Sequence, residues 1–99
     1  MRWYLARGYR VLDRNWRCPT GELDLVVEHA GVVVFCEVKA RASDRYGPAA
    51  SAVDARKQQK LRALALAWLA AHPNLRRRSL RFDVAAVTGA RINVIESAF

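Results

Sequence analysis

An unbroken apolar run at residues 32–36 constrains the fold of this chain more than any other segment. A strand without alternating polar residues is buried on both faces of its sheet, so other elements must cover that sheet on both sides. We therefore expect a central strand over residues 32–39. Glu37 and Lys39 bring charge to the end of this strand, where buried polar groups need partners.

The remaining segments predict the other elements. Alternating apolar residues between turn signals predict four more strands, at residues 9–16, 22–28, 80–87 and 92–95. A long helix is expected from Ser51 or Asp54, either of which can cap it, to His72. Residues 2–7 predict the tail of a helix whose beginning the chain lacks. Short turns and a helical crossover predict one α/β domain over residues 1–99, with a central mixed five-stranded sheet flanked by helices.

The charge balance points to the class of partner. Lys and Arg number 17 and Asp and Glu 9, a net charge of +8. This favours a polyanion such as DNA, because each neutralised phosphate releases counterions, although a basic proteome would give the same excess. The candidate phosphate contacts are Arg41, Lys57, Arg76, Arg77 and Arg78. The run at 76–78 could equally be a solvated loop, and we expect Arg56 and Lys60 on the solvent face of the long helix.

Cysteine usage and hydropathy predict the compartment. The chain has 2 cysteines without CxxC spacing, so both are expected to be free thiols, with Cys36 in the core. The longest stretch free of charged residues, 63–75, is too short to span a bilayer, which takes about 20 apolar residues. No export signal follows Met1. We expect a cytoplasmic protein that does not span a membrane.

The hairpin over residues 22–39 brings two carboxylates together. If its turn is the two-residue loop at 30–31, or a four-residue loop around it, Asp24 lies directly opposite Glu37. A three-residue loop would instead place Asp24 opposite Cys36. Regular alternation also predicts a shared face for Leu23, Leu25 and Val27.

Opposed carboxylates repel each other, and a divalent cation would remove that cost. Lys39 lies two residues beyond Glu37 and so projects on the same face. Two carboxylates and a lysine around a metal suit phosphodiester hydrolysis. The alternative is an exposed hairpin end with a Glu22–Lys39 ion pair. Asp83, within an apolar strand, is expected to form a structural salt bridge with a nearby arginine.

Two motifs carry a family resemblance. Gly-Glu-Leu-Asp-Leu at 21–25 and Phe-Cys-Glu-Val-Lys-Ala-Arg at 35–41 resemble the YraN-type endonuclease-like family. That family is similar to archaeal Holliday-junction resolvases and belongs to the PD-(D/E)xK nuclease superfamily. The resemblance covers nearly the whole chain, although the family usually opens with a longer helix bearing a glutamate that points toward the metal site.

The resemblance implies a restriction-endonuclease-like fold and a Mg²⁺- or Mn²⁺-dependent endonuclease acting on DNA, including branched or damaged DNA. It implies these residues: Asp24 and Glu37 as metal ligands with the carbonyl of Val38, Lys39 as the catalytic lysine, and Glu22 and Gln58 as supporting residues at the site edge. Paired cuts on a two-fold junction would call for a homodimer. The alternative function is a nucleic-acid-binding module that keeps this fold without significant catalysis.

Overall fold

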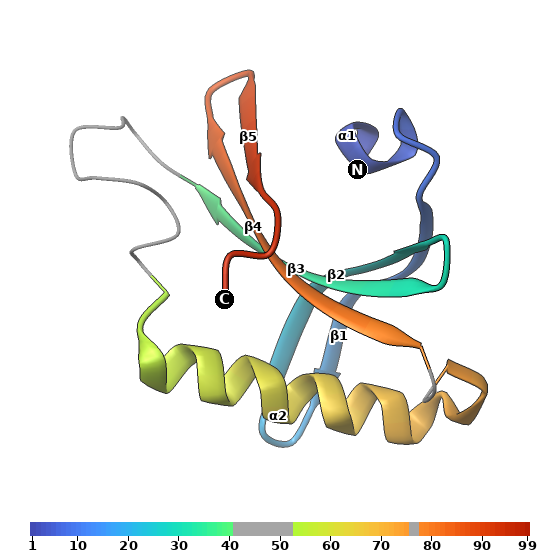
Figure 1. Cartoon of the computed structure of the whole chain (residues 1–99). Helices are drawn as coiled ribbons and strands as arrows, with labels where there is room; N and C mark the ends of the chain where they lie inside the picture. The colour runs from blue at the N-terminus through green and yellow to red at the C-terminus, as the bar shows by residue number, and fades with distance from the viewer. Residues whose placement is uncertain (41–52, 76–77) are drawn as a thin grey trace.

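The computed structural model describes residues 1–40, 53–75 and 78–99 (Figure 1). In chain order the elements are α1 (Arg2–Leu5), β1 (Arg10–Cys18), β2 (Gly21–His29), β3 (Val32–Ala40), α2 (Ala55–Ala71), a 3₁₀ turn η3 (Pro73–Leu75), β4 (Ser79–Thr88) and β5 (Arg91–Ile95). Every predicted strand is present, with bounds shifted by one or two residues. Within the described ranges, no helix is long and apolar enough to cross a membrane.

The strands form one mixed sheet in the order β1-β2-β3-β4-β5. All neighbours are antiparallel except β3 and β4, which run parallel and pair Val32 with Ser79 through Ala40 with Val87. The α2 helix lies between β3 and β4 in the chain and runs along one side of the sheet, while α1 lies on the other (Figure 1). This confirms the predicted α/β fold with a five-stranded mixed sheet, which is compatible with a restriction-endonuclease-like arrangement.

The sheet separates two apolar cores. Beneath α2, Leu61, Leu64 and Trp68 pack against Phe35 and Phe82, and Trp68 is fully buried. The second core lies on the α1 side and contains Tyr4, Leu25, Val27, Val34, Cys36 and Ala85. The central strand therefore buries side chains on both faces, as its unbroken apolar run predicts.

The regular alternation of side chains along β2 is broken at Asp24. Leu25 and Val27 belong to the core on the α1 side, but Leu23 belongs to the core under α2, so the expected shared face is wrong. The backbone explains the change, because Asn15 on the neighbouring strand adopts a left-handed conformation with φ of 50°. Asn15 and Asp24 are not among the paired residues of the β1–β2 ladder. On the two sides of Asp24, side chains two residues apart on β2 therefore point to opposite faces of the sheet.

The start of α2 is set by a side-chain cap. Asp54 is the N-cap, and its Oδ1 accepts a hydrogen bond from the backbone N of Lys57 at 2.9 Å. Of the two expected caps, Ser51 lies outside the described residues. The helix ends at Ala71 with His72 as its C-cap, just before Pro73. The cap holds Lys57 in the first turn, at the helix end nearest to the carboxylates described next.

Candidate metal and nucleic-acid site

The β2–β3 hairpin has the register that the two-residue loop predicts. Ala30 and Gly31 both have positive φ, 50° and 81°, as a type I′ turn requires. The paired residues run from His29–Val32 to Leu25–Cys36, so the three-residue alternative is excluded. Counted one step further, Asp24 stands across from Glu37.

The paired ladder stops just before these two carboxylates. Instead of a backbone oxygen, Oδ2 of Asp24 accepts a hydrogen bond from the backbone N of Val38 at 2.9 Å. Because the N–H and C=O of one strand residue project to the same side, the carbonyl of Val38 also faces β2. Where β2 and β3 separate, the carboxylate of Asp24 and the carbonyl of Val38 thus lie beside an opening between the strands.

A cavity of about 220 Å³ lies at this opening, on the α2 side of the sheet. Its lining residues come from β2, β3 and α2: Glu22, Asp24, Glu37, Lys57, Lys60, Leu61 and Leu64. The structure therefore brings four of the predicted site residues to one cavity. Lys60 is exposed, as expected, and also lines the cavity. Its position three residues after Lys57 is the sequence signal that would have placed it there.

Two lysines approach the same carboxylate oxygen. The Nζ of Lys57 lies 3.1 Å from Oε1 of Glu37, and the Nζ of Lys39 lies 3.6 Å from it. Lys39 is on the same face as Glu37, as its spacing predicts. Contact with Lys57 and partial burial lower the pKa of Lys39. Lys57 lines the cavity, and Lys39 lies beside the same carboxylate without being among the lining residues.

The environment of Asp24 disfavours its ionised form. Burial is the main cause that raises the pKa of Asp24, and the charges of Glu37 and Glu22 raise it further, while the Val38 hydrogen bond opposes them. Among the described residues, no group of three or more His, Cys, Asp or Glu side chains is arranged to hold a metal ion. The available donors are two carboxylates and one carbonyl. This set suits Mg²⁺, which takes one or two protein carboxylates and fills its other positions with water.

Of the two expected supporting residues, Glu22 lines the cavity, whereas Gln58 is not among its lining residues. The carboxylate of Glu22 pairs with Arg17 of β1 through a 2.6 Å contact to its Nε. The ion pair between Glu22 and Lys39 in the alternative interpretation is therefore wrong, because β2 leaves β3 beyond Leu25 and follows β1. Gln58 is half-buried, and its side-chain amide donates to the carbonyl of Val53 at 3.1 Å, so it braces the start of α2.

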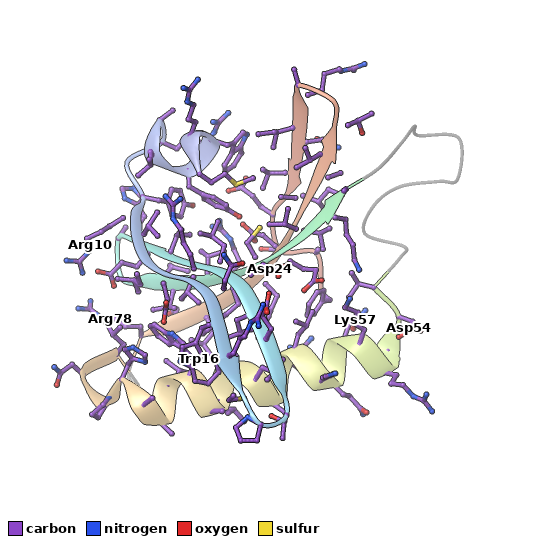
Figure 2. All side chains as sticks on the ribbon, turned by 180° about the vertical axis from the view of Figure 1, so that it is seen from behind. Arg10, Trp16, Asp24, Asp54, Lys57 and Arg78 are labelled. Atoms are coloured by element: carbon purple, nitrogen blue, oxygen red, sulfur yellow. The ribbon has the colours of Figure 1, made fainter. Side chains whose placement is uncertain are left out.

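Of the remaining candidate phosphate contacts, the structure describes only Arg78. Arg41, Arg76 and Arg77 lie outside the described residues. Arg78 is exposed and immediately precedes β4, whose Ser79 N donates to the carbonyl of Gly31 at 3.2 Å. It therefore lies at the turn end of the β2–β3 hairpin, and Figure 2 shows it at the opposite end of α2 from Lys57.

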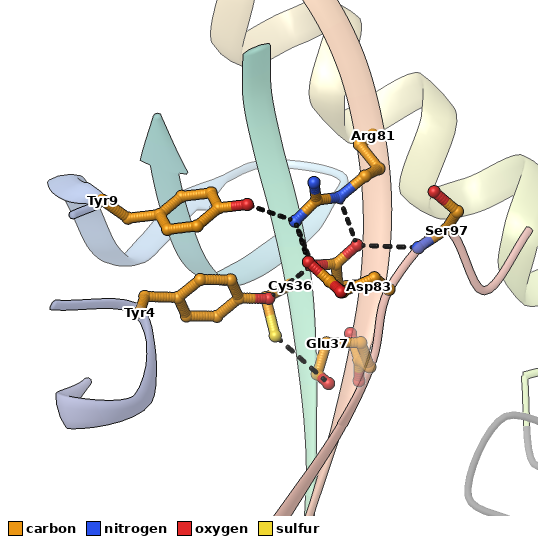
Figure 3. Close-up of polar contacts among 8 residues, drawn as sticks. Tyr4, Tyr9, Cys36, Glu37, Arg81, Asp83 and Ser97 are labelled. Atoms are coloured by element: carbon orange, nitrogen blue, oxygen red, sulfur yellow. Dashed lines mark hydrogen bonds and ion pairs between the residues drawn. The ribbon is translucent and has the colours of Figure 1, made fainter. Parts of the chain in front are cut away.

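Asp83 forms a structural salt bridge with Arg81, as expected. It is fully buried, accepts from the Nε of Arg81 at 2.9 Å and from the hydroxyl of Tyr4 at 2.7 Å, and also accepts from the backbone N of Ser97 at 3.0 Å (Figure 3). Its neighbour across the parallel ladder is Cys36, the residue before Glu37. The network thus ties α1 and the segment after β5 to the strand beside the site.

Comparison with known proteins places the chain in a family. Residues 1–87 match the family described as "Uncharacterised protein family UPF0102". A UPF0102 protein of Frankia casuarinae is 52% identical over an alignment of 99 positions. The alignment covers 95% of this chain and 83% of that protein. UPF0102 proteins of Clavibacter michiganensis and Ralstonia nicotianae are each 46% identical; the alignments cover 95% and 100% of this chain, and 83% and 78% of those proteins. The chain belongs to the UPF0102 family.

Proposed function

We propose that this protein is a metal-dependent endonuclease that hydrolyses phosphodiester bonds of DNA. The observation that carries the proposal is the cavity on the α2 side of the sheet, at the end of the β2–β3 ladder. There, Asp24 and Glu37 meet two lysines, one from the strand and one from the first turn of α2. Adjacent carboxylates with nearby cations are the groups that metal-assisted phosphodiester hydrolysis needs.

Each side chain has a role in this reaction. Asp24 and Glu37, with the carbonyl of Val38, would hold Mg²⁺ or Mn²⁺, which when bound would acidify a water and polarise the phosphoryl group. The two lysines pair with Glu37 and offset its charge. With a phosphate present, Lys39 orients the attacking water and offsets developing charge, and Lys57 donates to a phosphate oxygen.

A DNA-binding module without significant catalysis is the second candidate. It is favoured by one observation: of the three carboxylates that line the cavity, Glu22 already pairs with Arg17 and Glu37 with two lysines, and no group of three or more metal-ligating side chains is found among the described residues. Both candidates use the net charge of +8 to bind DNA, so binding alone does not separate them.

Cleavage by the wild type and by Asp24→Asn separates the two functions. The asparagine keeps a side-chain oxygen for the Val38 N–H but removes the charge. We expect wild-type protein to cut linear, single-stranded or branched DNA with Mg²⁺ or Mn²⁺, and Asp24→Asn to lose about 100-fold or more in rate. Glu96→Gln, which removes an exposed carboxylate paired with Arg81, is the matched control and should cut normally.

Two outcomes would count against catalysis. DNA binding without any metal-dependent cleavage would leave the binding module as the function. Cleavage that survives Asp24→Asn and Lys39→Ala would mean that the reaction occurs elsewhere or comes from a contaminant. We further propose that the protein acts in the cytoplasm. We also propose that it acts as a homodimer on two-fold junctions, and sedimentation with and without junction DNA would test this oligomeric state.

A further inference from the structure

A second cavity lies on the other side of Asp24. It has a volume of about 210 Å³ and is lined by Met1, Arg14, Asn15, Asp24, Leu25 and Val38. Leu25 and Met1 belong to the core on the α1 side, so this cavity opens on the sheet face away from Glu37 and α2. Asp24 lines both cavities, because it stands where the ladder ends and the faces reverse.

Arg14 is the cationic side chain among the residues that line this second cavity. It pairs with Leu25 across the β1–β2 ladder, and Asn15 then turns the backbone with its φ of 50°. Two other arginines on the same strand have carboxylate partners: Arg10 pairs with Glu28, and Arg17 with Glu22. Arg14 is exposed, and no ion pair is found for it among the described residues. Its guanidinium is therefore available to an anion from outside.

We propose that Arg14 and the cavity around it form a second phosphate subsite, which takes a phosphate flanking the scissile one on the same nucleic-acid strand. This inference rests on the proposed function, since the scissile phosphate defines the first subsite. A strand that crosses the open end of β2 and β3 passes over Asp24 and meets one cavity on each side. Consecutive phosphates then contact Lys57 on the α2 side and Arg14 on the α1 side.

The chemistry of the second cavity suits a phosphodiester. A guanidinium binds two phosphate oxygens in a planar fork, and the amide of Asn15 can donate to a third. The apolar walls formed by Leu25 and Met1 reduce the screening of this contact by water. Arg14 also offsets the repulsion that the carboxylate of Asp24 would exert on an incoming phosphate. Charge complementarity thus favours a nucleic-acid strand over a neutral ligand.

The test is the salt dependence of DNA binding, measured in EDTA so that no cleavage occurs. The probes are a fluorescein-labelled 20-nucleotide single strand and the matching duplex. We expect Arg14→Gln to flatten the log–log slope by about 0.7 on the single strand and about 0.9 on the duplex, the loss of one phosphate contact. Arg10→Gln and Arg17→Gln remove the same charge from the same strand and should flatten it by less than half as much. Circular dichroism and thermal unfolding verify that each variant is folded.

A second measurement separates this inference from the proposed function. In cleavage assays Arg14→Gln should raise KM several-fold with kcat nearly unchanged, whereas Asp24→Asn should abolish kcat. A wild-type salt slope in Arg14→Gln, or equal slopes in all three arginine variants, would overturn the subsite even if cleavage by the wild type is confirmed. A selective effect of Arg14→Gln on binding would support the subsite even if the wild type does not cleave.

Discussion

Asp83 is a buried carboxylate whose two oxygens both accept hydrogen bonds. Its carboxylate has no exposed surface, yet the Arg81 guanidinium, the hydroxyl of Tyr4 and a backbone N–H all donate to it (Figure 3). Such a network is fully satisfied only when every member is in place. At the proposed site, in contrast, the two lysines Lys39 and Lys57 approach the same oxygen of Glu37. The Asp83 network therefore stabilises the fold, whereas a lysine at the proposed site can exchange its contact with Glu37 for one with a ligand.

Replacing Asp83 should therefore destabilise the protein strongly. Asp83→Ala leaves Arg81 without its buried partner and the Tyr4 hydroxyl without an acceptor, and we expect a loss of about 3 kcal/mol in the free energy of unfolding. Urea denaturation measures this value. Glu96→Ala removes the other, exposed partner of Arg81 and should cost less than about 1 kcal/mol. Equal effects of the two substitutions would mean that burial of the network contributes nothing.

Tyr4 should make the protein sensitive to alkaline pH. The pKa of Tyr4 lies well above its usual value. Burial is the largest cause of this rise, and the nearby Asp83 adds to it. The folded protein then keeps the phenol protonated while the unfolded chain ionises, so stability falls as pH rises above about 10. Tyr4→Phe should be about 1 kcal/mol less stable at pH 7, where it lacks the hydrogen bond to Asp83. This difference should shrink between pH 10 and 11 in urea titrations; a constant difference would contradict the argument.

At the scale of elements, the parts that follow from local chemistry could be predicted from sequence. The two-residue turn at Ala30 and Gly31 fixed the β2–β3 register, because only one turn type fits a positive φ at both positions. The face reversal at Asp24 could not be predicted, because strict alternation assumes a regular backbone and Asn15 departs from it. The meeting of Lys57 with Glu37 depends on how α2 packs on the sheet, which spacing in the chain does not encode.

The cap of α2 should matter for both stability and the site. Asp54→Ala removes the acceptor for the Lys57 N–H and should cost about 1 kcal/mol of unfolding free energy, measured by thermal denaturation. Asp54→Asn keeps an acceptor and should restore most of that loss. Because the cap holds the helix turn that carries Lys57, we also expect weaker DNA binding in Asp54→Ala than in Asp54→Asn. Identical behaviour of the two variants would show that the cap is dispensable.

At the scale of the whole molecule, the proposed function implies a path for the DNA, which the positions of the basic residues constrain. The candidate site is at the α2 start, and Arg78 is at the opposite end of that helix (Figure 2). One duplex can contact both only by running along α2, whose 17 residues span about 26 Å at 1.5 Å per residue. This is less than one turn of B-DNA, roughly 34 Å.

Replacing Arg76, Arg77 and Arg78 together by Gln should therefore weaken binding without slowing chemistry. We expect the log–log salt slope on a 20-base-pair duplex to flatten by up to about three units of 0.9, with the cleavage rate at saturating DNA unchanged. Fluorescence anisotropy and single-turnover cleavage measure the two quantities. An unchanged slope would mean that this part of the chain points away from DNA, and a slower chemical step would mean that it reaches the site.

The parallel pair at the centre of the sheet has a consequence for how the protein is made. Val32 of β3 pairs with Ser79 of β4, so the middle of the sheet closes only after α2 and the segments around it have been synthesised. The three strands before it can form early through short turns, yet β3 then keeps one edge unpaired and Phe35 without its stacking partner Phe82. We therefore expect the insertion of β4 to be the slowest step of folding. A nascent chain that stalls before it presents an open apolar strand to its neighbours, and aggregation would begin at β3.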